Sequence, residues 1–307
     1  MADAAAADRI LHRAAGERLR RDFTLAPLTS FRLGGPARLY LEAISIEDLA
    51  CVGDALEASG LPLLVIGKGS NLLIADAGFP GIVVRLGKSF RWAARDGDLL
   101  SAGGAMPLPA LAGVALAHEL GGLEFGVAIP ASLGGSVRMN AGAHARSLDE
   151  VVTAIEIYDL GARALSVVPA EAAGFRYRGS ALPEPGVVIG ATLRLEPGDP
   201  EKIRALMDEA RRWRRETQPL AEPNCGSVFK NPEGDHAARL IEAAGGKELS
   251  VGGARVASKH ANFIIAGPGA TAGDVWELIA RIRTRVREEH GIELETEVHA
   301  VGLGGAR

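Results

Sequence analysis

The sequence predicts an α+β protein of two domains, and three features of its 307 residues support this interpretation. Helical segments with capping residues alternate with short apolar runs of strand length. Two glycine-rich loops interrupt this pattern before residue 145. Pro197-Gly198-Asp199-Pro200 is the clearest linker, so we place a domain boundary there. We expect an N-terminal helical segment at 1–27, a first domain at 28–197 and a smaller second domain at 198–307.

Composition narrows the class of protein. With 47% hydrophobic and 23% charged residues the chain is typical of globular proteins, and a net charge of −4 argues against a nucleic-acid binder. Cys51 and Cys225 are too few for a disulfide scaffold, and no metal-ligand spacing is present, so we expect no metal. The first residues lack the apolar core of a secretory signal. We expect a cytoplasmic monomer that binds neither nucleic acid nor membranes.

Helices are predicted where capping residues bound a periodic apolar stripe. We expect a frayed helix up to about Arg21, without a role of its own. Ser45 and Asp48 begin the next helix and Gly60 ends it, while Thr271, Asp274 and Gly291 do the same for the last. The predicted helices after the first are 45–59, 108–120, 201–216, 237–244 and 271–290.

Strands are predicted from apolar runs and from alternation. The run 63–66 reads as a buried strand, and a second strand follows the loop after it. Further strands are expected within 28–38 before a Gly-Gly-Pro turn, and at 39–42, 151–165, 187–195 and 292–301. A loop and a strand are expected at 252–265. In the strand at 292–301, Glu293, Glu295, Glu297 and His299 share one face. A solvated face is the simpler interpretation. If the face meets a cleft, mutual repulsion would raise the pKa of at least one carboxylate, as suits an acid catalyst.

The two glycine-rich loops suggest a large ligand. Gly67-Lys68-Gly69-Ser70-Asn71 can turn its amides toward an anion, although it lacks the dinucleotide fingerprint. The segment 121–143 is expected to be a loop in which Gly134-Gly135-Ser136 leaves backbone bare for a flat ligand or a second backbone. Both loops together favour a large cofactor more than either does alone.

The segment 223–232, PNCGSVFKNP, places a hydroxyl, a cation and an amide after a glycine turn. It is either a surface turn before a helix or part of a ligand site. Cys225 is expected to be a small buried residue, because the sequence places no histidine to activate it.

Eight sequence motifs follow one another in a fixed order along the chain. They are SFRLGGPA (30–37), VIGKGSNLLI (65–74), IPASLGGSVRMNAGA (129–143), YRGS (177–180), TQP (217–219), GSVFKNP (226–232), KHANF (259–263) and LETEV (294–298). This combination resembles the UDP-N-acetylenolpyruvoylglucosamine reductase family from about residue 28 to 302. The short connection between residues 178 and 217 is similar to the type II form.

The resemblance implies a PCMH-type (vanillyl-alcohol-oxidase-like) FAD-binding domain of two α+β lobes, then a smaller substrate domain, with FAD as cofactor, NADPH as reductant and UDP-N-acetylglucosamine enolpyruvate as substrate. Arg178, Ser227 and Glu297 match the family's catalytic positions. Expected cofactor residues are Gly67, Lys68, Gly69, Ser70, Asn71, Leu72, Ile129, Pro130, Gly134, Gly135, Ser136, Val137, Asn140, Gly142 and Ile189. Expected substrate residues are Gln218, Lys230, Asn231 and His260. Ala131, Leu133 and Leu28 depart from the usual motifs and leave the catalytic three untouched.

Reduction of an enolpyruvyl ether requires the chemical groups that Arg178, Ser227 and Glu297 carry. Hydride addition to its methylene carbon builds negative charge on the conjugated carboxylate, which Arg178 and a protonated Glu297 would stabilise. Ser227 would then protonate the neighbouring carbon. Two alternatives remain: a flavoenzyme acting on another substrate, and a non-catalytic binder of nucleotides or sugar nucleotides.

Overall fold

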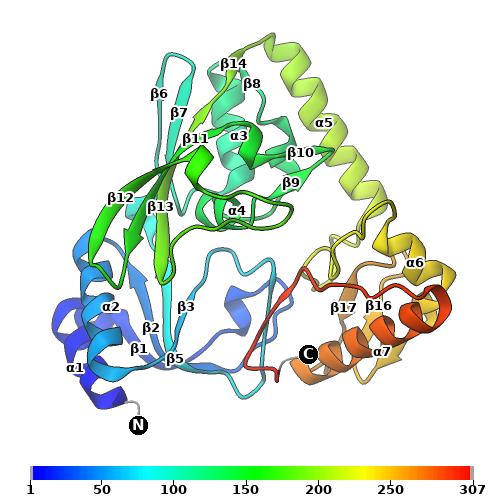
Figure 1. Ribbon diagram of the computed structural model, residues 1–307, viewed down its shortest axis with the longest axis horizontal. Helices are drawn as coiled ribbons and strands as arrows, with labels where there is room; N and C mark the ends of the chain where they lie inside the picture. The colour runs from blue at the N-terminus through cyan, green and yellow to red at the C-terminus, as the bar shows by residue number, and fades with distance from the viewer. Residues whose placement is uncertain (1–2, 305–307) are drawn as a thin grey trace. The chain divides into compact units, whose positions relative to one another are not determined.

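The computed structural model describes residues 3–304, which form two compact units interleaved along the sequence. Unit 1 contains the residues up to Arg21, Arg38–Lys68 and Pro80–Trp213. Unit 2 contains Asp22–Ala37, Gly69–Phe79 and the chain from Arg214 onward. The three-part division of the chain into domains predicted above stays a prediction. The α+β class is confirmed, since both units contain α-helices and β-strands (Figure 1).

Two sheets account for most strands before residue 195. The first has the order β1-β2-β5-β3, and β3 runs parallel to β5. Its strands are Leu19–Thr24, Pro36–Ala43, Phe79–Leu86 and Leu63–Val65 in that order. The second has the order β12-β11-β13-β7-β6 and is antiparallel. Its strands are Ala164–Pro169, Val152–Asp159, Gly186–Arg194, Leu99–Gly103 and Ala93–Asp96.

Helices α1 (Ala4–Ala15) and α2 (Ile46–Ser59) lie side by side and share a core with β2 and β5 (Figure 1). As predicted, the Ser45 hydroxyl accepts a hydrogen bond from the Asp48 amide and Gly60 ends α2 in the left-handed region. The expectation of a frayed, idle first helix up to Arg21 was wrong. Helix α1 ends at Ala15, and its Ala7 and Leu11 are fully buried. A 3-10 turn, Gly16–Arg18, then leads into β1.

The second sheet packs against α3 (Leu108–Ala117) and α4 (Leu133–Arg138), which share its core. Leu108, Leu111, Ala112 and Ala115 form the buried face of α3, as predicted. The segment 121–143 was expected to be a loop, but it contains α4, because small residues also pack closely in a helix. Two short strand pairs complete this region: β8 (Leu120–Gly121) with β14 (Glu196–Pro197), and β9 (Gly142–Ala143) with β10 (Arg146–Ser147).

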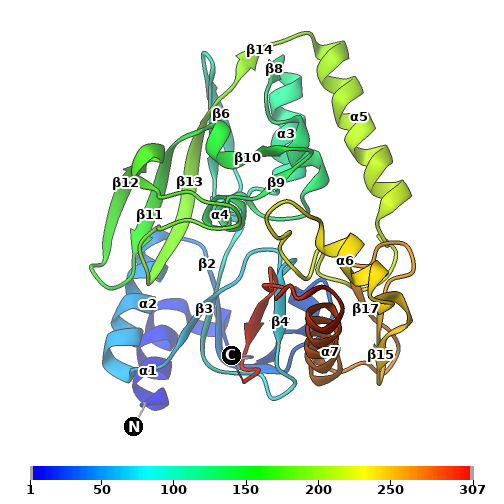
Figure 2. The ribbon, with the colours of Figure 1, turned by 45° about the vertical axis from the view of Figure 1, so that its right-hand side comes forward.

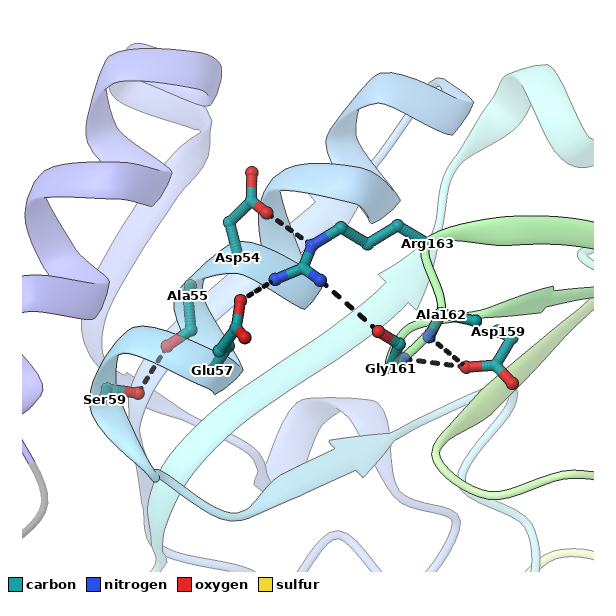
Figure 3. A network of polar contacts seen from close by, with 8 residues as sticks. All are labelled: Asp54, Ala55, Glu57, Ser59, Asp159, Gly161, Ala162 and Arg163. Atoms are coloured by element: carbon teal, nitrogen blue, oxygen red, sulfur yellow. Dashed lines mark hydrogen bonds and ion pairs between the residues drawn. The ribbon is translucent and has the colours of Figure 1, made fainter.

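Arg163 ties helix α2 to the turn between β11 and β12 (Figure 3). Its guanidinium forms ion pairs with Asp54, at 2.5 Å, and with Glu57. A Cβ atom on Gly53 of α2 would lie 2.4 Å from the carbonyl oxygen of Leu160, so the helix approaches this turn as closely as a glycine allows. The predicted strand 151–165 is therefore two strands, with a turn at its end that contacts α2.

Unit 2 is built around α7 (Ala272–His290), which lies beside β15–β17 (Figure 2). Thr271 and Asp274 form the predicted capping box, and Asp76 accepts hydrogen bonds from the amides of Ala272 and Gly273. The strands are Ser250–Val251, Ala254–Val256 and Ile264–Ala266, and β4 (Leu72–Ile74) pairs in parallel with β18 (His299–Val301). The remaining helices are α5 (Pro200–Thr217), which begins in unit 1, and α6 (Ala237–Ala243).

Three other strand predictions need correction. The residues before the Gly-Gly-Pro turn form a 3-10 turn, Ala26–Leu28, instead of a strand. Strand β3 is not fully buried, since Val65 is 38% exposed. The final strand covers only His299–Val301, although Leu294 and Val298 are buried and Glu293 and Glu295 exposed, as the alternation predicted. Within residues 3–304, no helix is both long and apolar enough to cross a membrane.

Candidate active site

An open cavity of about 270 Å³ lies within unit 1, lined by residues of β3, β5, β13 and α4. Gly67, Lys68, Gly134 and Gly135 line it, so the two glycine-rich stretches meet. Gly104, which the sequence analysis missed, lines it as well. A Cβ atom on Gly104 would lie 2.2 Å from the carbonyl oxygen of Val188, and one on Gly134 would lie 2.7 Å from the same atom. Only glycine fits where these backbones meet.

The lining of the cavity is strongly cationic. Burial lowers the pKa of Lys68, and the positive charges of Arg91 and Arg85 lower it further. Like charges held this close favour an anionic ligand. The cationic residues of the lining are Lys68, Arg85, Lys88, Arg91 and Arg138, and its acidic residue is Glu42.

The other predicted cofactor residues of unit 1 lie outside this lining. Ser136, Val137 and Asn140 are buried, and the Ser136 hydroxyl has no hydrogen-bond partner among the described residues. Asn140 donates to the carbonyl oxygen of Arg176 at 3.3 Å. Ile129, Pro130, Gly142 and Ile189 are not part of the lining either. In unit 2, Gly69 packs against Leu28, Ser70 follows it, and Asn71 precedes Leu72, the first residue of β4.

Arg178 lies in a tight turn closed by an antiparallel bridge between Arg176 and Gly179. Its φ of 55° is in the left-handed region, which is uncommon for residues other than glycine and frequent at functional sites. The guanidinium donates to the carbonyl oxygen of Gly142 at 3.2 Å and lies 4.8 Å from the centre of the Tyr177 ring. Asn140 and Gly142 therefore hold the turn that carries Arg178.

Ser227 precedes a backbone segment that Asn262 holds at three points. The Asn262 side chain accepts from the Phe229 amide at 2.9 Å and donates to the Phe229 carbonyl oxygen at 2.8 Å. Its own carbonyl oxygen accepts from the Val228 amide at 2.9 Å. These bonds satisfy backbone groups that a neighbouring strand would otherwise bind. Asn262 is 3% exposed, so the bonds lie away from solvent. The sequence analysis quoted this asparagine within KHANF without giving it a role.

Glu297 runs beside the Ser227 segment in unit 2. Its amide donates to the Val228 carbonyl oxygen at 2.8 Å, and Thr296 forms an antiparallel bridge with Phe229. The Asn71 side chain donates to the Glu297 carbonyl oxygen at 2.9 Å. Two of the predicted catalytic residues, Ser227 and Glu297, thus lie on neighbouring hydrogen-bonded segments of one unit, whereas Arg178 belongs to the other unit.

Cys225 is buried, as predicted. Burial raises the pKa of its thiol, and the negative charge of Glu297 raises it further. A thiol held neutral in this way is a poor nucleophile.

The four predicted substrate residues belong to unit 2, and each has a partner within it. Lys230 forms an ion pair with Glu295 at 2.5 Å, and Gln218 accepts from Arg214. Asn231 accepts from the Ala237 amide at the start of α6, and the His260 ring accepts from the Asn262 amide. Their roles toward substrate stay predictions. In the described part of the chain, no group of three His, Cys, Asp or Glu side chains could hold a metal ion, and the expectation of a metal-free protein stays a prediction.

Comparison with known proteins decides the family. A reductase of Anaeromyxobacter dehalogenans named UDP-N-acetylenolpyruvoylglucosamine reductase is 45% identical over 295 residues, which cover 96% of this chain and 89% of the relative. The enzyme of that name from Moorella thermoacetica is 45% identical over 276 residues, covering 90% of this chain and 91% of the relative. The chain belongs to the UDP-N-acetylenolpyruvoylglucosamine reductase family.

Two protein-family models also match segments of this chain. Residues 37–164 match the FAD binding domain, and residues 218–301 match the C-terminal domain of UDP-N-acetylenolpyruvoylglucosamine reductase. The crystal structure of this reductase (MurB) from Thermus caldophilus has a TM-score of 0.80 and 36% identity, covering 92% of this chain and 99% of that one. The predicted family and the PCMH-type α+β fold are confirmed.

Proposed function

We propose that this member of the reductase family uses FAD and NADPH to reduce UDP-N-acetylglucosamine enolpyruvate to UDP-N-acetylmuramate, a precursor of peptidoglycan. Family membership supports FAD-dependent reduction of a UDP-sugar enolpyruvate. The observation that carries the residue roles is the backbone hydrogen bond between Glu297 and Val228, which keeps an acid beside the segment bearing Ser227. That the enzyme is a cytoplasmic monomer remains a prediction.

The cavity of unit 1 fits the cofactor on two counts. Gly67, Gly104, Gly134 and Gly135 line it without Cβ atoms, so a ligand can approach the main chain closely. Its cationic lining suits a pyrophosphate. We propose that Gly67, Lys68, Gly134 and Gly135 hold FAD there. The orphaned hydroxyl of Ser136 is a further candidate donor. When bound, reduced FAD supplies hydride to the methylene carbon of the enolpyruvyl group.

The protein's own residues would stabilise the developing negative charge and donate the proton. Arg178, fixed by the Gly142 carbonyl oxygen, would stabilise the substrate carboxylate as negative charge develops on it. Glu297 in its protonated form would donate a hydrogen bond to the same charge. Ser227 would give its hydroxyl proton to the carbon next to the carboxylate. Lys230, Asn231, Gln218 and His260 are candidates for binding the rest of the substrate.

An anaerobic two-step experiment tests this function. NADPH is added to the purified protein, and the flavin absorption band should bleach. UDP-N-acetylglucosamine enolpyruvate is then added, and the band should return as UDP-N-acetylmuramate forms. Bleaching without return would favour a flavoenzyme with another substrate. A protein that binds no flavin, even after FAD is added, would favour the non-catalytic alternative.

A further inference from the structure

Asn71 is the last residue of the first glycine-rich loop and adjoins a pair of parallel strands. The pairing of β4 with β18 begins at the next position, where Leu72 is opposite His299. The two residues before His299 lie outside a regular strand. Glu297 is one of them, so no strand ladder holds its peptide groups.

The side chain of Asn71 extends the pairing beyond its end. Its Nδ2 donates to the Glu297 carbonyl oxygen at 2.9 Å, while the Asn71 carbonyl oxygen accepts from the His299 amide at 3.0 Å. On the other side, the Glu297 amide donates to the Val228 carbonyl oxygen at 2.8 Å. Glu297 is therefore held through its carbonyl group by Asn71 and through its amide by the residue that follows Ser227.

The carboxylate of Glu297 lies near the turn that carries Ser227. Its charge contributes to the raised pKa of the Cys225 thiol, two residues before Ser227. Rotation of the Glu297 backbone would move this carboxylate relative to the serine hydroxyl. A misplacement of about 1 Å can cost a catalysed step about 100-fold.

We propose that Asn71 is a positioning residue for proton delivery, acting through the main chain of Glu297. This inference rests on the proposed function. It gives Asn71 a different task from the one expected above, which was to bind the cofactor. The two tasks are separable, because one concerns reoxidation by substrate and the other concerns retention of flavin.

The test compares half-reactions in Asn71→Ala and wild-type protein. Flavin content and the rate of bleaching by NADPH should stay within about twofold, while the rate of reoxidation by UDP-N-acetylglucosamine enolpyruvate should fall by about 10- to 100-fold. Arg285→Ala is a matched control, since Arg285 also donates to a main-chain carbonyl oxygen in unit 2, that of Ala244 at 3.0 Å. It should leave both rates within about twofold.

A double-mutant cycle separates positioning from general damage. In a Glu297→Gln background, Asn71→Ala should slow reoxidation by no more than about threefold, because the group it positions is already lost. Asn71→Ser serves the same cycle if the alanine variant does not fold. Independent, multiplicative effects would overturn the role, as would a loss of flavin or an equal slowing of both half-reactions. Wild-type protein that is not reoxidised would instead overturn the proposed function.

Discussion

The cavity of unit 1 and the Ser227–Glu297 region of unit 2 differ in which atoms they present, backbone atoms in the first and side chains in the second. In the cavity, glycines present the backbone itself. The backbone at Gly104 and Gly134 also packs so close to Val188 that neither position has room for a Cβ atom. Around Ser227, side chains are presented, and the amides of Asn262 and Asn71 fix the backbone beneath them. Added atoms should therefore damage the first region, and removed hydrogen bonds the second.

The largest effect is expected where the side chain itself is the reagent. Ser227→Ala should lower turnover by about 10³-fold or more, because the proton donor is lost, while flavin content and bleaching by NADPH remain normal. Stopped-flow absorbance of the two half-reactions measures both. If bleaching slowed as much as reoxidation, Ser227 would not be the proton donor.

In the cavity, an added methyl group should remove flavin. Gly104→Ala places a Cβ 2.2 Å from a carbonyl oxygen, so the backbone must shift, and we expect a cost of about 1–3 kcal/mol in the free energy of unfolding. Protein-bound flavin, measured by absorbance after gel filtration, should fall severalfold.

Gly113→Ala is the matched control. Gly113 lies within α3 and a Cβ there meets no atom within 4 Å. The substitution should stabilise the helix by about 0.5–1 kcal/mol and leave flavin content unchanged. Similar flavin loss in both variants would show that close backbone approach is not what the cavity needs.

Removal of the buried amide should affect unit 2 instead. Asn262→Ala leaves the Phe229 amide and carbonyl groups buried without these partners, at a cost of about 1–3 kcal/mol. Chemical denaturation measures this loss. Reoxidation by substrate should slow more than bleaching by NADPH, whereas equal slowing would contradict the contrast between the two regions.

The smallest effect concerns pH. Burial lowers the pKa of His260 below its ordinary 6.5, and its ring accepts a hydrogen bond from the Asn262 amide, which requires the neutral form. The unfolded chain binds this proton at a higher pH than the folded chain does. The free energy of unfolding should therefore decrease as pH falls through about 6.5 toward the folded-state pKa.

Denaturation curves of wild-type and His260→Gln protein at several pH values between 5 and 8 isolate this contribution. The variant should show a shallower decline in stability on acidification. An unchanged slope would mean that His260 is not held neutral.

Local sequence signals predicted the parts of the fold that local interactions determine. The caps at Ser45 and Thr271 set the starts of α2 and α7, since a hydroxyl next to free helix amides needs no distant partner. The end of α1 was misjudged, because Leu19–Thr24 has ordinary helical propensity and becomes a strand through pairing with β2. The final strand was overextended, because alternation predicts burial but does not provide a pairing partner.

The candidate site shows the same division. The glycines at 67 and 134 could be identified from their spacing, and the structure brings them to one cavity. Gly104, Arg85 and Arg91 could not, since nothing in their local sequence shows that they line it. Asn262 carries no signal of its own either, because its role depends on Phe229, 33 residues away.

The interleaving of the units bears on how the protein is synthesised. Strand β4 leaves the ribosome long before its partner β18, and also long before α7, whose first amides bond to Asp76. Unit 2 therefore cannot be completed until β18 has been synthesised. During that interval the apolar residues of β4 lack their final cover, so nascent chains should depend on chaperones longer than the order of the motifs suggests.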